Sequence, residues 1–146
     1  MKQRHSTSAK AQAIIAKLAA PALIEDLGPL AARFVLALRL IALHERVGRD
    51  PVPELAVRLG SLDIAAKALS LSQVISSTWP DNIHISRFCC HMLTHDEQTI
   101  GALIASVAER DRDAFNANLE GLIRPSRVEL LWEAVLSLIV AEASAA

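Results

Sequence analysis

The chain has 146 residues, 52% of them hydrophobic and only 3% aromatic, with a formal net charge of −1. A chain of this length can fold as one domain without disulfides or a metal, and its high share of hydrophobic residues excludes a wholly disordered protein. The charge balance also argues against nucleic-acid binding, which relies on a positive surface to neutralise phosphates. A core of aliphatic residues with few aromatics favours helices over strands.

The N-terminal part is predicted to contain a short tail and one interrupted helical region. Residues 1–8 are polar and predict a flexible tail, so that 9–146 forms a single helical domain. Residues 9–27 have a helical composition interrupted by Pro21, which predicts either two helical pieces or a kinked helix. Charged side chains interrupt both the N-terminus and the most apolar stretch, 30–43. We therefore expect a cytoplasmic protein that does not insert into a membrane.

Glycines and prolines divide the next part of the chain into three helices. A helix over 30–47 is predicted between Pro29 and Gly48, since proline suits the first helical position and glycine follows helix ends. Shorter helices are predicted over 54–59, ended by Gly60, and over 62–76. Residues 78–86 are rich in turn formers, with 83–85 able to be extended, and predict a loop at the middle of the chain.

Capping signals mark three helices in the second half. Thr94 precedes Glu97 by three positions and Ser126 precedes Glu129 by three, the spacing of a reciprocal cap, so helices are predicted over 95–109 and 126–143. Asp111 can cap a helix over 112–123 that Pro125 terminates. The predicted fold class is all-α: a compact, single-domain bundle of about five to seven helices.

Two of these helices are apolar nearly all the way round. In 30–43 the polar residues are Arg33 and Arg39, and in 128–141 they lie on one narrow stripe. The second helix is therefore either the central core helix or an oligomer interface, and the two interpretations are compatible. The candidate interface residues on it are Leu131, Trp132, Val135 and Leu138.

Residues that can bind metal or react as thiolates gather at the middle of the chain. They are His84, Cys89, Cys90, His91 and His95. Zinc or iron would need three or four of these donors to converge, and a cysteine near a helix N-terminus and histidines can become a reactive thiolate. The third interpretation, which the absence of a Cys-x-x-Cys spacing favours, is that both cysteines are buried small hydrophobes and the histidines are capping or surface groups.

Residues 53–69 imitate a helix-turn-helix, because Ala56, Gly60 and Leu69 match its small residue, turn glycine and core leucine. The second helix offers few side chains that read bases or phosphates, so DNA binding is disfavoured. No phosphate-binding glycine loop or nucleophile elbow is present in the sequence, which predicts a protein that is not an enzyme.

The segment from Arg87 to Glu97, RFCCHMLTHDE, resembles an uncharacterised bacterial family of short helical proteins without an assigned activity. The resemblance extends over the helix around 34–46 and the short helices between, and so over most of the chain after about Leu30. The family often has proline at the position of His91 and methionine at that of Leu93. This resemblance implies a helical fold but supplies no activity, cofactor or partner.

The sequence thus predicts a non-enzymatic protein-interaction or self-associating module, whose partner is a second copy or another protein. The alternatives are a metal or thiol sensor centred on Cys89 and Cys90, and a helix-turn-helix DNA-binding regulator.

Overall fold

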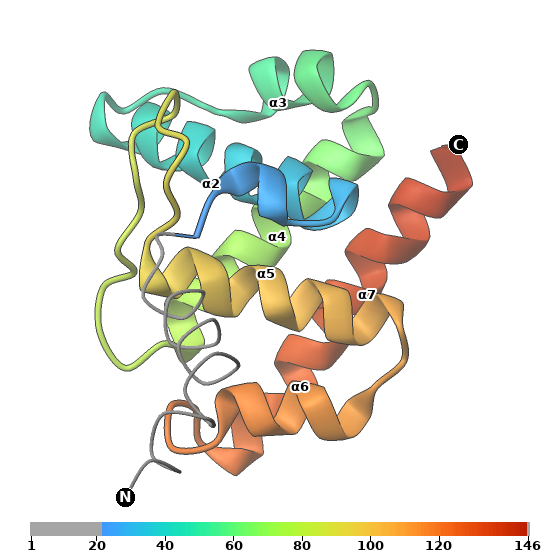
Figure 1. Cartoon of the computed structure of the whole chain (residues 1–146). Coiled ribbons are helices and arrows are strands. Elements are labelled where there is room, and N and C mark those ends of the chain that lie inside the picture. Colours follow the sequence, from blue (N-terminus) through green and yellow to red (C-terminus); the bar gives the residue numbers. More distant parts are fainter. Residues whose placement is uncertain (1–21, 146) are drawn as a thin grey trace, which may run out of the picture.

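Six α-helices and one 3-10 turn make up the computed structural model, which describes residues 22–145 (Figure 1). The elements are η2 (Ile24–Asp26), α2 (Pro29–Arg46), α3 (Val52–Leu59), α4 (Leu62–Thr78), α5 (His95–Ala108), α6 (Arg112–Leu119) and α7 (Pro125–Ala145). Within this part of the chain the extended pairing is limited to an isolated bridge between Leu23 and Met92. The all-α class and the number of helices are confirmed. The predicted tail over 1–8 and helical region over 9–21 lie outside the described residues.

The glycine and proline signals of the first half act as predicted. Pro29 is the first residue of α2, where its missing N–H costs nothing. Gly48, with φ +69°, follows the end of α2, and Gly60, with φ +78°, caps α3. Both glycines adopt the left-handed conformation that other residues rarely take, which explains why these helices end where they do.

The helix ends of the second half are partly different from the prediction. Thr94 and Asp111 cap α5 and α6 as expected. However, α6 already ends at Leu119, and Pro125 begins α7 instead of terminating the preceding helix. The predicted cap formed by Ser126 and Glu129 is therefore wrong, because Ser126 lies inside the first turn and Glu129 pairs with Arg112 instead. Proline is favoured at a first helical position, and this preference sets the start of α7.

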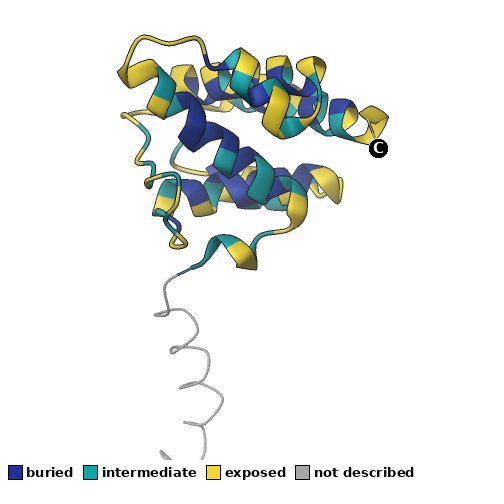
Figure 2. Cartoon of the chain, turned by 90° about the horizontal axis from the view of Figure 1, so that it is seen from above, coloured by how far each residue is buried: buried dark blue, intermediate teal, exposed yellow. Residues whose placement is uncertain are grey.

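The helices surround one aliphatic core, with α3 at one end of the bundle and α6 at the other (Figure 1). Helix α4 packs on α7 and α3, while α5 packs on α2, α6 and α7. Buried residues face one another across these contacts, and exposed residues lie on the outer sides (Figure 2). One aromatic pair joins α6 to α7, with the rings of Phe115 and Trp132 edge to face at 5.0 Å between centroids.

Candidate functional site

A sixteen-residue irregular segment, from Trp79 to Thr94, connects α4 to α5; we call it the 79–94 loop. Segments of this length without secondary structure of their own are uncommon in a compact domain and are usually functional. Four of the five predicted metal or thiol residues lie in this loop, and the fifth, His95, is the first residue of α5. The loop is therefore the candidate functional site.

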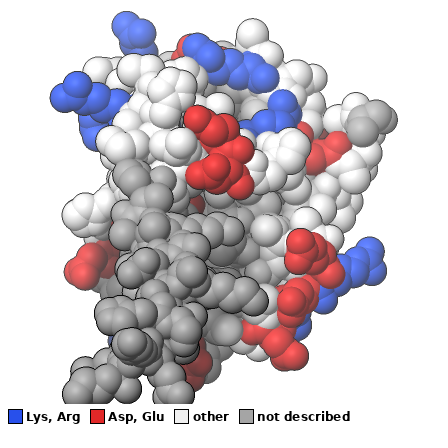
Figure 3. All heavy atoms as spheres, in the orientation of Figure 1, with Lys and Arg blue, Asp and Glu red and all other residues white. Residues whose placement is uncertain are grey.

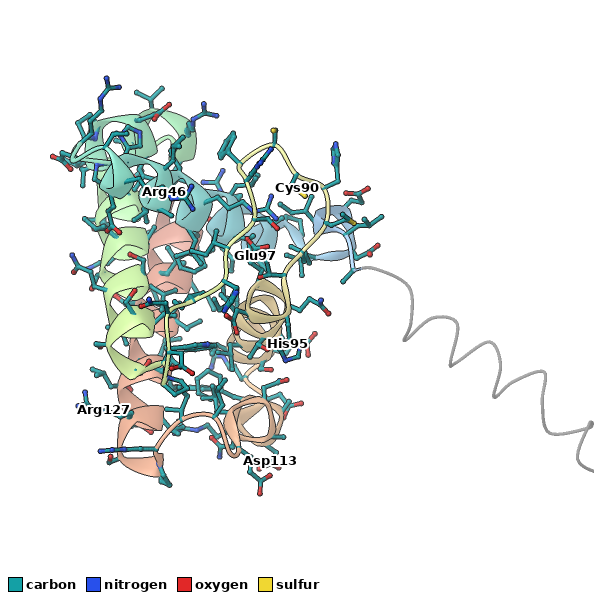
Figure 4. All side chains as sticks on the ribbon, turned by 90° about the vertical axis from the view of Figure 1, so that its left-hand side faces the viewer. Arg46, Cys90, His95, Glu97, Asp113 and Arg127 are labelled. Atoms are coloured by element: carbon teal, nitrogen blue, oxygen red, sulfur yellow. The ribbon has the colours of Figure 1, made fainter. Side chains whose placement is uncertain are left out.

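A buried ion pair lies directly beneath the loop. Arg39 of α2 and Glu97 of α5 form two hydrogen bonds, from Nε to Oε2 at 2.8 Å and from Nη2 to Oε1 at 3.0 Å. Both side chains are 0% exposed. The Arg39 guanidinium also donates to the backbone carbonyls of Cys90, at 2.6 Å, and Met92, at 3.1 Å. One arginine thus joins two helices to the loop. Figure 4 labels two of the residues it connects, Glu97 and Cys90.

The carboxylate of Glu97 is held by the loop as well as by Arg39. It accepts the backbone N–H of Thr94 at 2.9 Å and that of Ser86 at 3.3 Å. Burial by itself raises the pKa of the Glu97 carboxyl, but the hydrogen bonds from Arg39, Thr94 and Ser86 outweigh it, and the pKa lies below its usual value. Glu97 is therefore a buried anion whose charge is satisfied from three directions.

The neighbouring acid, Asp96, holds the start of the loop. Its carboxylate accepts the indole N–H of Trp79 at 3.3 Å and the backbone N–H of His84 at 2.8 Å. The Thr94 hydroxyl donates to the His84 carbonyl at 2.6 Å. The first turn of α5 therefore fixes the loop at both ends, so the loop has a defined conformation although it contains no helix or strand.

The sequence does not predict this arrangement, although both residues stand out in it. Arg39 is a polar exception in an apolar helix, and Glu97 is a capping residue at the edge of the cluster of potential ligands. The usable signal is the arginine: a charged side chain on the buried face of a helix has to meet an acid, because an unpaired buried charge is very costly. Nothing in the sequence shows which acid it meets.

The two cysteines are free and differ in exposure: Cys89 is exposed and Cys90 is partly buried. The interpretation of both as buried small hydrophobes therefore does not describe Cys89. His84, His91 and His95 are all exposed, and His91 Nδ1 lies 3.9 Å from a carboxylate oxygen of Glu25. All three histidine side chains are therefore accessible to solvent at the surface of the loop or at its junction with α5.

These donors do not converge in the described structure. Within residues 22–145, no three side chains of His, Cys, Asp or Glu are placed so that they could hold one metal ion. Cys89, Cys90 and His91 are consecutive in the loop, but neither alone nor with His84 or His95 do they form such a group. Zinc or iron binding stays a prediction, and it requires a change in the loop's conformation.

The candidate interface residues on α7 lie mostly inside the protomer. Leu131, Val135 and Leu138 are buried in the core, which fits the interpretation of α7 as a core helix. Trp132 is partly buried, packed on Phe115 and covered by the guanidinium of Arg112 at 4.6 Å. The large apolar side chains that α7 leaves exposed are Leu130 and Val140. Three of the four candidate interface residues are therefore not available to a partner in this conformation.

The helix-turn-helix lookalike corresponds to α3 and α4, which pack against each other. One side of α4 is buried, and the polar residues of its first half, Asp63, Lys67 and Ser70, include a single basic residue. No helix in the described part of the chain is long and apolar enough to cross a membrane.

Comparisons of the chain with protein-family models, with curated proteins and with solved structures gave no match. The resemblance of residues 87–97 to an uncharacterised bacterial family therefore stays a prediction.

Proposed function

We propose that this chain is a non-enzymatic protein-interaction module whose contact surface is built around the 79–94 loop. The observation that carries the proposal is the buried pair of Arg39 and Glu97, whose remaining hydrogen bonds all go to this loop or its junction with α5. Removing two charges from water costs several kcal/mol for each ion, so such a pair adds little net stability. Its effect is to fix one conformation of an exposed segment.

A loop that is ordered before binding has an advantage in recognition. The entropy of ordering it is lost on folding and not again on association, so more of the contact energy appears as affinity. The loop presents side chains of the kinds enriched in protein interfaces: Met92 is 52% exposed, Phe88 is partly buried and Arg87 is exposed. The partner is a second copy of the chain or another protein.

Light scattering coupled to size-exclusion chromatography tests the self-association arm. The wild type is compared at high micromolar concentration with Met92→Asp, in the loop, and with Leu130→Asp, a matched control on α7. We expect Met92→Asp to weaken assembly and Leu130→Asp to leave it unchanged. The proposal is wrong if the wild type is a monomer and also binds no peptide from a random library in a way that Met92→Asp weakens.

The exposure of Cys89 favours a second function, a thiol-based sensor. Modification of this thiol would change the same contact surface, because Cys89 lies in the loop next to Cys90, whose carbonyl accepts a hydrogen bond from Arg39. Native thiol titration of wild type, Cys89→Ser and Cys90→Ser tests it, together with elemental analysis of untagged protein. One fast thiol that disappears only in Cys89→Ser supports a sensor. Two slow thiols without stoichiometric metal contradict it.

A further inference from the structure

An apolar slot lies between α2 and α3 and is closed on one side by Phe88 of the 79–94 loop; we call it the α2–α3 slot. Its volume is about 260 Å³, and its aliphatic walls include Leu36 and Leu40 of α2 and Leu55 and Leu59 of α3. An apolar cavity of about 150 Å³ is enough to hold benzene. The slot is therefore large enough for one leucine, isoleucine or phenylalanine side chain.

The charged residues that line the slot are two arginines, and they differ in what they bind. Arg33 donates to Glu142 at 2.8 Å and 2.9 Å and to the Leu59 carbonyl at 3.0 Å, so its charge is used within the protomer. The Arg58 side chain is 50% exposed, and its guanidinium lies over the Phe88 ring, 4.8 Å from the centroid.

Arg58 is only weakly held by acids of its own chain. It lies 3.5 Å from Glu54, whose carboxylate is hydrogen-bonded to His44, and that bond is the main reason why the Glu54 pKa is lowered. The cation–π contact with Phe88 places the guanidinium at the rim of the slot, and apart from the N–H that faces Glu54 its N–H groups have no acceptor among residues 22–145. Arg58 is thus positioned to bind a carboxylate from outside.

Helix α3, the link before it and the end of α2 carry further exposed basic and apolar residues. Basic side chains lie at the α3 end of the molecule on the face drawn in Figure 3, with acidic side chains between them, and acidic residues outnumber basic ones in the described part of the chain. Arg46 and Arg49, at the end of α2 and in the link to α3, are exposed, as is Arg87 next to Phe88. Val47 and Val57, on the link and on α3, are 64% and 82% exposed.

We propose that the α2–α3 slot binds an acidic segment of a partner protein, with one large apolar side chain of that segment in the slot and a flanking Asp or Glu on Arg58. This inference rests on the proposed interaction function and specifies its partner. In protein interfaces an apolar side chain buried in a pocket usually provides most of the affinity, while complementary charges at the rim provide specificity. A nucleic acid fits less well, because its backbone has no aliphatic side chain to fill the slot.

Selection of random twelve-residue peptides on the immobilised full chain provides the first test. We expect the enriched sequences to share one Leu, Ile or Phe flanked by Asp or Glu. A fluorescein-labelled peptide of the enriched consensus is then titrated by fluorescence anisotropy against wild type, Arg58→Glu, Leu36→Glu and Arg127→Glu. Arg127 is exposed near the start of α7, so this last variant is a matched control for the charge change (Figure 4).

Arg58→Glu and Leu36→Glu should each weaken binding about tenfold or more, while Arg127→Glu should stay within about twofold of the wild type. Higher salt should weaken the binding of the peptide to the wild type. Circular dichroism and urea unfolding show that each variant is folded. Enriched peptides without acidic residues, binding that Arg58→Glu leaves unchanged, or the absence of any enrichment overturns the inference. Peptides that lose binding in Met92→Asp but not in Arg58→Glu overturn it while leaving the interaction function in place.

Discussion

Arg39 and Glu97 lie 58 positions apart in the chain and form a bidentate ion pair in which neither side chain is exposed to solvent. The pair connects α2 to α5, and its remaining hydrogen bonds reach four residues of the 79–94 loop, Ser86, Cys90, Met92 and Thr94. Its removal should therefore affect helix packing and loop conformation together.

Glu97→Gln should lower the free energy of unfolding by about 3–5 kcal/mol, because it leaves the buried guanidinium of Arg39 without a counter-charge. Urea unfolding at pH 7, followed by circular dichroism, measures the loss. Glu142→Gln is the matched control: its partner Arg33 is 42% exposed, so the change should cost at most about 1 kcal/mol.

The double variant Arg39→Met, Glu97→Leu should recover most of the stability that Glu97→Gln loses, since apolar residues of similar size avoid the cost of desolvating two ions. Hydrogen exchange at the Ser86 and Thr94 amides should nevertheless stay faster than in the wild type. A double variant with wild-type exchange at both amides would show that the ion pair does not order the loop.

Acid should destabilise the wild type more steeply than Glu97→Gln. The pKa of Glu97 is lower in the folded chain than in the unfolded chain, because the hydrogen bonds from Arg39, Thr94 and Ser86 outweigh its burial. Its contribution is therefore complete above the ordinary glutamate pKa of about 4.3 and is lost as the pH falls through the lowered folded value. Urea midpoints of both proteins between pH 7 and pH 3 measure this, and parallel curves would contradict it.

Asp96→Ala should loosen the beginning of the loop without unfolding the bundle. The change removes the acceptor for the Trp79 indole N–H and the His84 backbone N–H, at a cost of about 1–3 kcal/mol. Tryptophan fluorescence and hydrogen exchange at His84 are the measurements. Asp63→Ala, which removes an exposed acid from the first turn of α4, is the control, and an equal effect of both variants would mean that Asp96 acts only on the helix dipole.

Thr94→Ala should cost about 1 kcal/mol, while Ser126→Ala should be nearly neutral. The sequence pattern is the same at both positions, but the Thr94 hydroxyl accepts the Glu97 N–H at 3.0 Å whereas Ser126 lies inside α7. Thermal unfolding of the two variants side by side distinguishes them. Equal losses would place a cap at Ser126 and contradict the start of α7 at Pro125.

Local signals predicted most of the fold. Residues such as Pro29, Gly60 and Asp111 act on the backbone within a few positions, so their effects are visible in the sequence. The error at Ser126 has the same origin, because two local signals competed and proline at the first helical position prevailed over the cap.

The sequence by itself determined the helical class, most helix boundaries and the position of a loop in the middle of the chain, predicted over 78–86 and found over 79–94. Only the tertiary structure decided that Arg39 meets Glu97, that Arg58 lies over Phe88, and that Leu131, Val135 and Leu138 face the core of their own protomer. Helix periodicity and caps depend on residues three or four positions apart. The partner of a buried charge or an apolar face is set by how distant segments pack, and no local pattern encodes it.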